Sequence, residues 1–300
     1  MIAKAIVKLI TKAVENPKLA LPKTSTNPKI HRLYRKAKEG QWDFEKERGF
    51  PESCEEINEW LGVTDEVRLA AARAFSSFYY GEHGAKLISA QLTLMAPTNE
   101  AAKFLSTQTM DEARHMEVFE GVLGFIDKIH PINPFLNAFL GDILEAKHFE
   151  DKLVGMNLLV EGLALSAFQL IVKNFQPGVN CTEQGYEAIG KPIERIIRDE
   201  SRHVGFGVLM LPEMLSKLSM RRKATLRLRQ LKWLLLLYGS VKYHQKDLEL
   251  IGLDYLNLLD NLIEDHEKRI VECGGEALIS TRQMKKLCPA IDSIVDRLRN

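Results

Sequence analysis

Apolar residues recur along most of this chain at the three- and four-residue spacing of amphipathic helices, whereas the alternation typical of strands is scarce. The longest regular stretches lie roughly between residues 64 and 215. Glycine and proline interrupt the helical pattern at four places, residues 16–29, 96–100, 130–135 and 175–180. The pattern therefore predicts an all-α protein whose long helices are joined at these breaks.

No low-complexity segment, short repeat or convincing linker divides the chain, so we expect a single domain over residues 1–300. Within it we expect an arm with short helices over residues 1–60, a helical bundle over about 64–215 and further helices over 216–300. A chain of 300 residues is ample to bury a core.

The net charge and the spacing of the cysteines limit the kinds of partner and compartment that we expect. The net charge of +1 gives no support for a nucleic-acid partner, and the basic run at 219–229 is better explained as a solvated helix face. The four cysteines lie far apart with no C-x-x-C pair, which favours a reducing, cytoplasmic setting. The apolar run WLLLLYG is far too short to cross a bilayer, and lysines interrupt the N-terminal apolar residues, so we expect neither a membrane span nor a signal peptide.

Two segments place acidic residues and a histidine inside helices that otherwise have a buried pattern. TMDEARHMEVF contains Glu112 and His115, and RDESRHVGF contains Glu200 and His203. A helix brings residues i and i+3 to one face, about 5–6 Å apart at Cβ, so each pair can bind one metal ion. Both pairs lie within the longer motif Asp-Glu-x-Arg-His, which makes the repetition informative.

A third Glu-x-x-His pair, Glu145 and His148, lacks the longer motif and lies in the polar run LEAKHFEDK. With eight histidines in the chain, about one such pair is expected by chance. We therefore interpret this pair as part of a solvated helix face.

Two further carboxylates complete a dimetal arrangement. A carboxylate-bridged dimetal site in a four-helix bundle takes a Glu-x-x-His pair from two helices and one Glu from each of the other two. Glu82 in FYYGEHGAKL and Glu161 in NLLVEGLALSAF are each flanked by apolar residues at helical spacing. An unpaired carboxylate in such surroundings would cost several kcal/mol, so a metal partner is indicated; the alternative is a helix edge that reaches water.

The positions of the turns agree with this arrangement. Two ligands at the same height on antiparallel helices are equidistant from the turn that joins the helices. Glu82 and Glu112 predict a turn near residue 97, in MAPTNE. Glu161 and Glu200 predict a turn near residue 180, in QPGVNC. The stretch between the first pair and Glu161 is long enough for a crossover along the bundle.

The predicted metal ligands are four carboxylates and two imidazoles: Glu82, Glu112, His115, Glu161, Glu200 and His203. Four carboxylates balance two divalent ions, and this donor set without thiolates suits iron or manganese. Asp111 and Asp199 directly precede the ligand glutamates, and we predict that they orient the histidines by accepting an N–H hydrogen bond. A surface position on the helix is the alternative for each aspartate.

At these motifs the chain resembles the ferritin-like superfamily, in its branch related to the ribonucleotide reductase small subunit. FLSTQTMDEARHMEVF, NLLVEGLALSAF and RDESRHVGFGV are similar to the metal-binding helices of the small-subunit-like ligand-binding oxidases, and residues 33–50 are similar to their entry segment. The resemblance covers roughly residues 30–215. It implies a ferritin-like four-helix bundle with a long crossover and flanking helices, and a centre of two iron ions, or one manganese and one iron, that reacts with O2.

Several positions depart from the best-known members of that superfamily. Phe119 stands where reductase small subunits usually have the radical tyrosine, and the C-terminal DSIVDRLRN lacks the tyrosine expected for docking the large subunit. Met156 and Ala85 replace the tyrosine and valine that form an ether link in the ligand-binding oxidases. Leu165 replaces a threonine common in multicomponent hydroxylases, and Ile196 replaces the extra histidine of the aryl-amine oxygenases.

The resemblance implies an O2-activating dimetal oxidase or oxygenase. No flavin or nicotinamide motif is visible, so we expect an external electron donor. Residues one or two turns from the ligands are predicted to line a pocket for a small, at least partly apolar substrate, with core packing as the alternative: Tyr79, Phe119, Met156, Leu165, Phe168, Val204 and Gly207. A radical-generating reductase subunit and a ferritin- or rubrerythrin-like iron-handling protein stay open as functions, and a homodimer stays open as the assembly.

Four glycines, Gly84, Gly162, Gly205 and Gly207, lie within predicted helices, where each costs about 1 kcal/mol relative to alanine. We expect them either to leave room or permit a π-bulge near the metals, or to allow close helix packing.

Overall fold

The computed structural model describes residues 27–47, 54–179, 181–276, 284 and 286–299, together with residues 6, 8 and 11. Much of the predicted N-terminal arm lies outside the described residues. Within the described ranges the regular elements are helices, and the one isolated β-bridge joins Pro177 and Cys181. The predicted all-α class is therefore confirmed.

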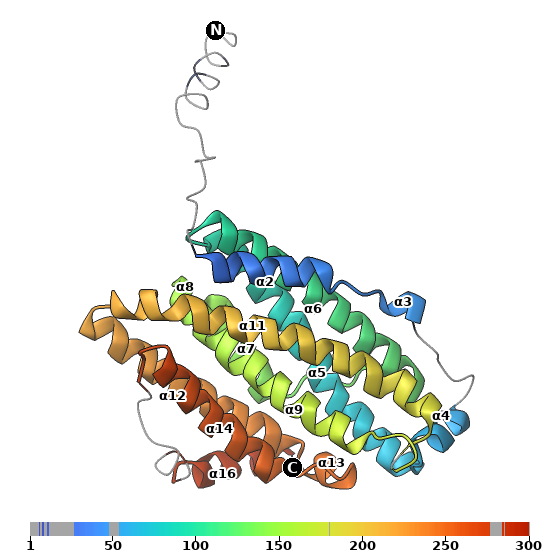
Figure 1. The fold of residues 1–300 in the computed structure, drawn as a ribbon. Helices are drawn as coiled ribbons and strands as arrows, with labels where there is room; N and C mark the ends of the chain where they lie inside the picture. The colour runs from blue at the N-terminus through green and yellow to red at the C-terminus, as the bar shows by residue number, and fades with distance from the viewer. Residues whose placement is uncertain are drawn as a thin grey trace.

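Two long helices form one half of the bundle (Figure 1). α5 spans Asp65–Met95 and begins after Thr64, whose hydroxyl accepts a hydrogen bond from an amide of the first turn. α6 spans Asn99–Ile126 and is capped in the same way by Thr98. Residues 96–98 join the two helices, so the predicted turn in MAPTNE is confirmed.

The other half consists of α9 (Glu161–Asn174) and α11 (Lys191–Ser216), which pack against each other. Their connection contains Gly178, whose φ of +73° is in the left-handed region that favours glycine. The connection confirms the predicted turn in QPGVNC, of which Asn180 lies outside the described residues. It continues into α10 (Glu183–Gly185) and a short π-helix, η2 (Tyr186–Gly190).

A crossover leads from the end of α6 to the start of α9, as predicted. It contains α7 (Pro134–Glu145), then α8 (Phe149–Leu153), and a seven-residue π-helix, η1 (Val154–Val160), which runs directly into α9. A π-helix has more residues per turn than an α-helix, so η1 changes the phase of the side chains that precede Glu161.

Three of the four glycines singled out in the sequence permit close helix packing. A Cβ atom at Gly84 would lie 2.8 Å from a leucine side chain of α7, and one at Gly207 would lie 2.8 Å from a side chain of η1. A Cβ atom at Gly162 would overlap an arginine of α14, whereas one at Gly205 would meet no atom within 4 Å. None of the four lies in η1 or η2, and Gly162 follows the end of η1 by two residues.

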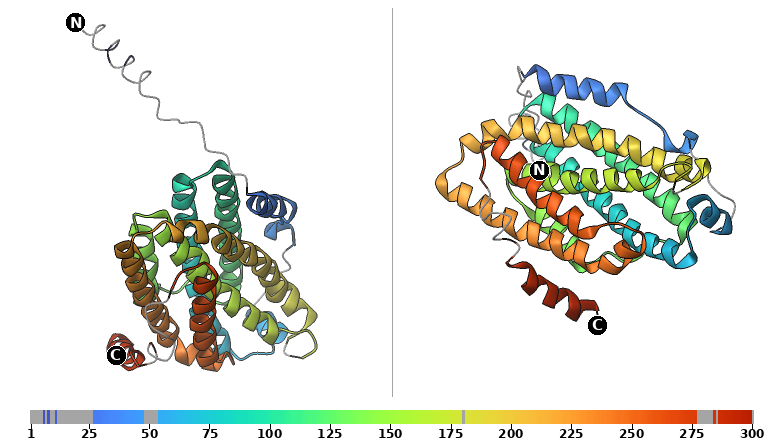
Figure 2. Two further views of the ribbon diagram at one scale, coloured as in Figure 1. Left: turned by 60° about the vertical axis from the view of Figure 1, so that its left-hand side comes forward. Right: turned by 60° about the horizontal axis from the view of Figure 1, so that its bottom comes forward.

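Further helices cover two sides of the bundle (Figures 1 and 2). On one side, α2 (Pro28–Glu39) packs on α6 and α11 and is followed by α3 (Phe44–Glu47) and α4 (Cys54–Leu61). The other side carries α12 (Met220–Tyr243), α13 (Gln245–Leu250), α14 (Tyr255–Glu272) and α16 (Cys288–Arg299).

A polar layer separates two clusters of buried apolar side chains. On α6, Leu105 belongs to one cluster and Val118 to the other, and Glu112 and His115 lie between them. The same two clusters lie on either side of the buried glutamates of the other helices. The order along the chain is the same in η1 and α9 and is reversed in α5 and α11. Charged groups in such an interior cost several kcal/mol each unless they are neutralised, so this layer requires partners.

One helix among the described residues, Phe149–Asn174, is long and apolar enough to cross a bilayer by length and composition. It comprises α8, η1 and α9, and most of its apolar window is covered by the rest of the bundle. Its composition is therefore that of a core helix that carries the buried Glu161.

Candidate metal centre

All six predicted ligands meet in the polar layer, and none is more than 4% exposed. Each of the four bundle helices contributes, since α5 and α9 supply one carboxylate each and α6 and α11 each supply a Glu-x-x-His pair. The side chains form two groups, and within each group the ligand atoms lie within 4.8 Å of one another. The first group is Glu82, Glu112, His115 and Glu200, and the second is Glu112, Glu161, Glu200 and His203.

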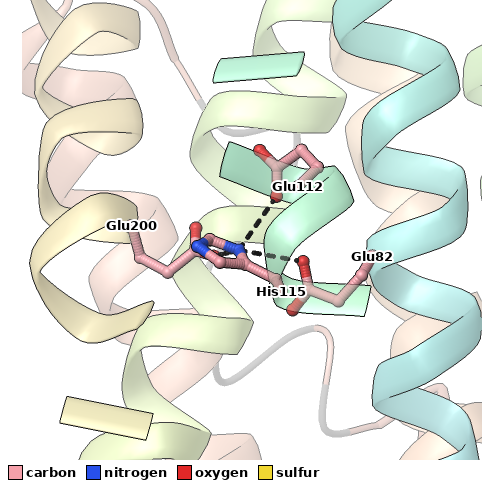
Figure 3. Close-up of side chains that lie close together, drawn as sticks. All are labelled: Glu82, Glu112, His115 and Glu200. Atoms are coloured by element: carbon pink, nitrogen blue, oxygen red, sulfur yellow. Dashed lines mark hydrogen bonds and ion pairs between the residues drawn. The ribbon is translucent and has the colours of Figure 1, made fainter. Parts of the chain in front are cut away.

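The two shared glutamates each direct one oxygen to each histidine. Oε2 of Glu112 lies 3.3 Å from Nδ1 of His115, and Oε1 lies 3.2 Å from Nδ1 of His203. Oε1 of Glu200 lies 3.2 Å from Nδ1 of His115, and Oε2 lies 3.4 Å from Nδ1 of His203. Figure 3 shows the first group, in which Glu82 also approaches His115. Carboxylates placed in this way can bridge two metal ions.

Several of these oxygens lack hydrogen bonds. Neither oxygen of Glu112, nor Oε1 of Glu200, accepts a hydrogen bond of good geometry from any residue that the structure describes. A buried polar atom without a partner costs about 1–3 kcal/mol, and more when it is charged. Metal ions bound between the two glutamates would satisfy all three atoms.

Electrostatics also indicate that the layer needs cations. Burial and the nearby Glu161 carboxylate raise the pKa of Glu112 well above its usual range and raise the pKa of Glu200 to about 8. Burial alone lowers the pKa of His115, but the close approach of Asp199 and the ligand carboxylates to its ring nitrogens raises it well above its usual value. The site is thus strongly negative, and bound cations would replace protons in it.

Two arginines balance the two aspartates that precede the ligand glutamates. Nη2 of Arg114 lies 2.6 Å from Oδ1 of Asp111 and 2.9 Å from Oδ2 of Asp199, and Arg202 contacts both aspartates as well. These two pairs of charges cancel. Once cations displace the protons of the layer, the four ionised glutamates with neutral histidines carry a charge of −4 (4 × −1), equal and opposite to that of two divalent ions. The donor set and the charge therefore fit a pair of iron or manganese ions.

The aspartates face the histidines across the site. Nε2 of His115 lies 3.3 Å from Oδ2 of Asp199, and Nε2 of His203 lies 3.2 Å from Oδ2 of Asp111. This geometry allows each histidine to direct Nδ1 to a metal ion while it donates its other N–H to a carboxylate. Trp42, which precedes α3, adds a donor, because its Nε1 lies 3.0 Å from Oδ2 of Asp199.

Two buried amides were not predicted from the sequence. Nε2 of Gln108 donates to Oε1 of Glu161 at 2.6 Å, and Nδ2 of Asn157 donates to Oε1 of Gln108 at 3.1 Å. Each amide lies four residues before a ligand glutamate. Asn157 is a lone polar residue in the apolar stretch LVGMNLLV, which was the available signal, whereas Gln108 lies in the polar run STQT and gave none. The arginine repeated at one position of both motifs was a second signal.

The third Glu-x-x-His pair takes no part in the site. Glu145 is the last residue of α7, and His148 precedes α8 as its N-cap, so the two do not share a helix face. Both side chains are exposed.

A cavity of about 100 Å³ adjoins the layer and is lined mainly by α5, α7, α9 and α12, with single residues from η1, α13 and α14. Two of the predicted metal ligands, Glu82 and Glu161, line one part of the cavity. The remaining walls are largely apolar and include Leu140, Leu163 and Leu237. Because these two carboxylates belong to different ligand groups, the cavity borders both metal positions.

The predicted pocket residues do not line this cavity; they are Tyr79, Phe119, Met156, Leu165, Phe168, Val204 and Gly207. Phe119 and Phe168 stack with ring centroids 5.7 Å apart in an apolar cluster, and Met156 is fully buried in η1. The prediction counted helical turns from the ligands. The cavity instead borders the face of α9 that carries Leu163 and Ala164, because α7 and α12 pack opposite that face.

The four helices and their long crossover define the ferritin-like fold, which confirms the predicted fold class. No protein-family model and no curated protein sequence matches the chain.

Solved structures do match the chain. A variant of an R2-like ligand-binding oxidase with a Mn/Fe cofactor is 20% identical, covers 82% of this chain and 93% of its own, and has a TM-score of 0.66. A second variant of that oxidase is 21% identical, with the same coverage and a TM-score of 0.64. A Synechococcus protein with aldehyde deformylating oxidase activity is 18% identical over 74% of this chain and 97% of its own, with a TM-score of 0.60. The predicted resemblance is thus confirmed as a likeness of fold.

Proposed function

We propose that this protein is an O2-activating oxidase or oxygenase with a non-heme dimetal centre. The observation that carries the proposal is the pair of ligand groups that share Glu112 and Glu200. Glu82 and His115 complete one metal position, and Glu161 and His203 complete the other. The similar structures include an oxidase with a Mn/Fe cofactor, so the metals are two iron ions or one manganese and one iron.

When bound, the reduced metal pair supplies the electrons and the open coordination for reaction with O2. The residues of the chain hold the ions and balance their charge. The two apolar clusters keep water out of the layer, so the oxidising power of the centre is directed to a bound molecule.

The cavity supports a small and largely apolar substrate. It places that substrate against Glu82 and Glu161, next to both metal positions. A separate electron donor is needed for repeated turnover. We also propose a cytoplasmic setting, in agreement with the well-separated cysteines, of which Cys181 and Cys273 are buried and form no disulfide within the described residues.

The test is reconstitution of the metal-free protein with Fe²⁺, or with Mn²⁺ and Fe²⁺, under anaerobic conditions, followed by exposure to O2. We expect two ions per chain and consumption of O2 that depends on the metals. Failure to bind two ions, or no reaction of the loaded protein with O2, would contradict the proposal.

The same experiment separates the alternatives. A persistent organic radical formed with O2 would favour a radical-generating subunit. Uptake of iron far beyond two ions per chain would favour an iron-handling protein.

A further inference from the structure

The cavity that borders the metal ligands has a second polar region. Ser77 of α5 and His244, between α12 and α13, both line it, and Oγ of Ser77 lies 3.0 Å from Nε2 of His244. The lining between this pair and the ligands Glu82 and Glu161 is mostly apolar. The cavity therefore has one region at the metal ligands and another at a hydrogen-bonding pair that the metal site does not use.

The pair is held in place from outside the cavity. Nδ1 of His244 lies 3.3 Å from Oδ2 of Asp247, and Nη2 of Arg73 lies 2.7 Å from Oδ1 of that aspartate. Despite burial, hydrogen bonds with His244 and Arg73 keep the pKa of Asp247 below its usual value. An ionised Asp247 accepts the Nδ1–H of the imidazole, which fixes the ring and leaves Nε2 to accept a hydrogen bond from the hydroxyl of Ser77.

The order serine, histidine, aspartate is also that of hydrolytic triads. Ser77, however, lies inside α5, where the neighbouring backbone amides are already bonded within the helix. Amide donors for an oxyanion are therefore not available beside its hydroxyl, and such donors are worth about 10²–10³ in rate. This geometry favours a binding role for the pair over a nucleophilic one.

We propose that Ser77 and His244 form a subsite for an oxygen function, a hydroxyl or a carboxyl group, at the far end of an alkyl substrate. Ser77 and Glu82 are five residues apart on one helix, which corresponds to about 7.5 Å along its axis. A substrate anchored at Ser77 thus places its alkyl end at the metal ligands. This assignment rests on the proposed function for the reaction and deepens it by naming the substrate class.

The volume limits the size of the molecule. The cavity measures about 100 Å³, and apolar cavities of about 150 Å³ are known to hold benzene. This smaller volume disfavours a ring and favours an extended chain. A chain of about six carbons with one oxygen function covers the distance of about 7.5 Å between Ser77 and Glu82 along α5 and is therefore the appropriate probe. A site with a half-buried hydrogen-bonding pair discriminates against a molecule that lacks the polar group, because such a molecule separates the pair from water and offers no hydrogen bond in exchange.

The experiment is calorimetric titration of 1-hexanol, hexanoate and hexane into the metal-loaded protein under anaerobic conditions and into the metal-free protein. We expect the protein to prefer hexanol or hexanoate to hexane, and the preferred one identifies the oxygen function. Ser77→Ala should weaken binding of the preferred probe about three- to tenfold, the effect of one hydrogen bond, and should leave hexane unchanged. The matched control is Ser89→Ala, which removes a buried hydroxyl from the same helix at a position outside the cavity.

A second variant tests the location. Ala164→Trp fills the cavity beside the metal ligands and should abolish binding of all three probes. Circular dichroism establishes that each variant is folded. Binding of the preferred probe to Ser77→Ala within twofold of the wild type would overturn the subsite, as would undiminished binding to Ala164→Trp.

Hydrolysis of p-nitrophenyl hexanoate that is lost in Ser77→Ala would also overturn the binding role, in favour of a nucleophile. The titrations into the metal-free protein separate the two proposals. Loss of the metal chemistry with retained, Ser77-dependent binding would reject only the proposed function. Metal-dependent O2 consumption without such binding would reject only the subsite.

Discussion

His115 donates toward an aspartate of the other motif, because its Nε2 lies 3.3 Å from Oδ2 of Asp199 on α11. The reverse contact, between His203 and Asp111 of α6, is 3.2 Å long. Each aspartate thus precedes a shared glutamate on its own helix and faces the histidine of the opposite helix. The two ligand groups are coupled through these contacts, because the histidine of each group depends on an aspartate of the opposite helix.

Asp199→Asn tests this coupling. The amide replaces an acceptor that is charged, because hydrogen bonds with His115 and the charge of Arg202 keep the pKa of Asp199 far below its usual range despite burial. We expect metal affinity to fall about 10- to 100-fold, the usual effect of losing such a partner. Competition with a chromophoric chelator measures the affinity. The surface variant Asp127→Asn, which loses a contact with His130, is the control, and equal affinities for the two variants would disprove the role of Asp199.

Replacement of the ligands should remove metal without unfolding the bundle. We expect Glu112→Ala or His203→Ala to lower the metal content well below two ions per chain, because Glu112 belongs to both groups and His203 completes one. Helix content measured by circular dichroism should stay close to that of the wild type. Glu145→Ala is the matched control from the third Glu-x-x-His pair, and a comparable loss of metal from it would mean that the ligands have been assigned incorrectly.

The reduced protein should react with O2 without leaving a persistent tyrosyl radical. Phe119, at the position of the usual radical tyrosine, has no phenol and is 1% exposed. Its ring stacks on those of Phe78 and Phe168, which also contact each other. Electron paramagnetic resonance after O2 exposure measures the radical. A stable tyrosyl signal, especially one that is lost in Tyr79→Phe, would be inconsistent with this expectation.

The stability of the metal-free protein should depend on His266 at acid pH. Burial and the charge of Arg269 lower the pKa of His266 to about 3. Below about pH 6.5 the unfolded chain binds a proton at this position and the folded chain does not, so the free energy of unfolding falls as the pH decreases from about 6.5 to about 3. The slope from this group approaches about 1.4 kcal/mol per pH unit.

His266→Gln removes this titration and keeps an amide beside Gln230, whose Oε1 lies 3.0 Å from Nε2 of His266. In urea unfolding at pH 7, 6 and 5, we expect the wild type to lose more stability on acidification than the variant. Parallel losses in the two proteins would show that His266 binds its proton equally well in both states.

The long helices of the bundle, both of its turns and the residues of the two ligand groups could all be predicted from the sequence alone. All of these are consequences of local spacing. A Glu and a His three residues apart share a helix face wherever the helix lies, and a turn halfway between two ligands brings them to the same height. The apolar residues on either side of each motif further implied that these charges would be buried and would need a metal.

The contacts between side chains of different helices could not be predicted from the sequence, because they depend on how the helices pack. The exchange of aspartates between His115 and His203, the cavity wall and the contact of Ser77 with His244 all join residues far apart in the chain. The pocket residues could not be found by counting turns, because the cavity lies where α7 and α12 leave space against α9, and packing between distant segments sets that space. Spacing along the chain selects a face of one helix, whereas the relative positions of all the helices select what that face contacts.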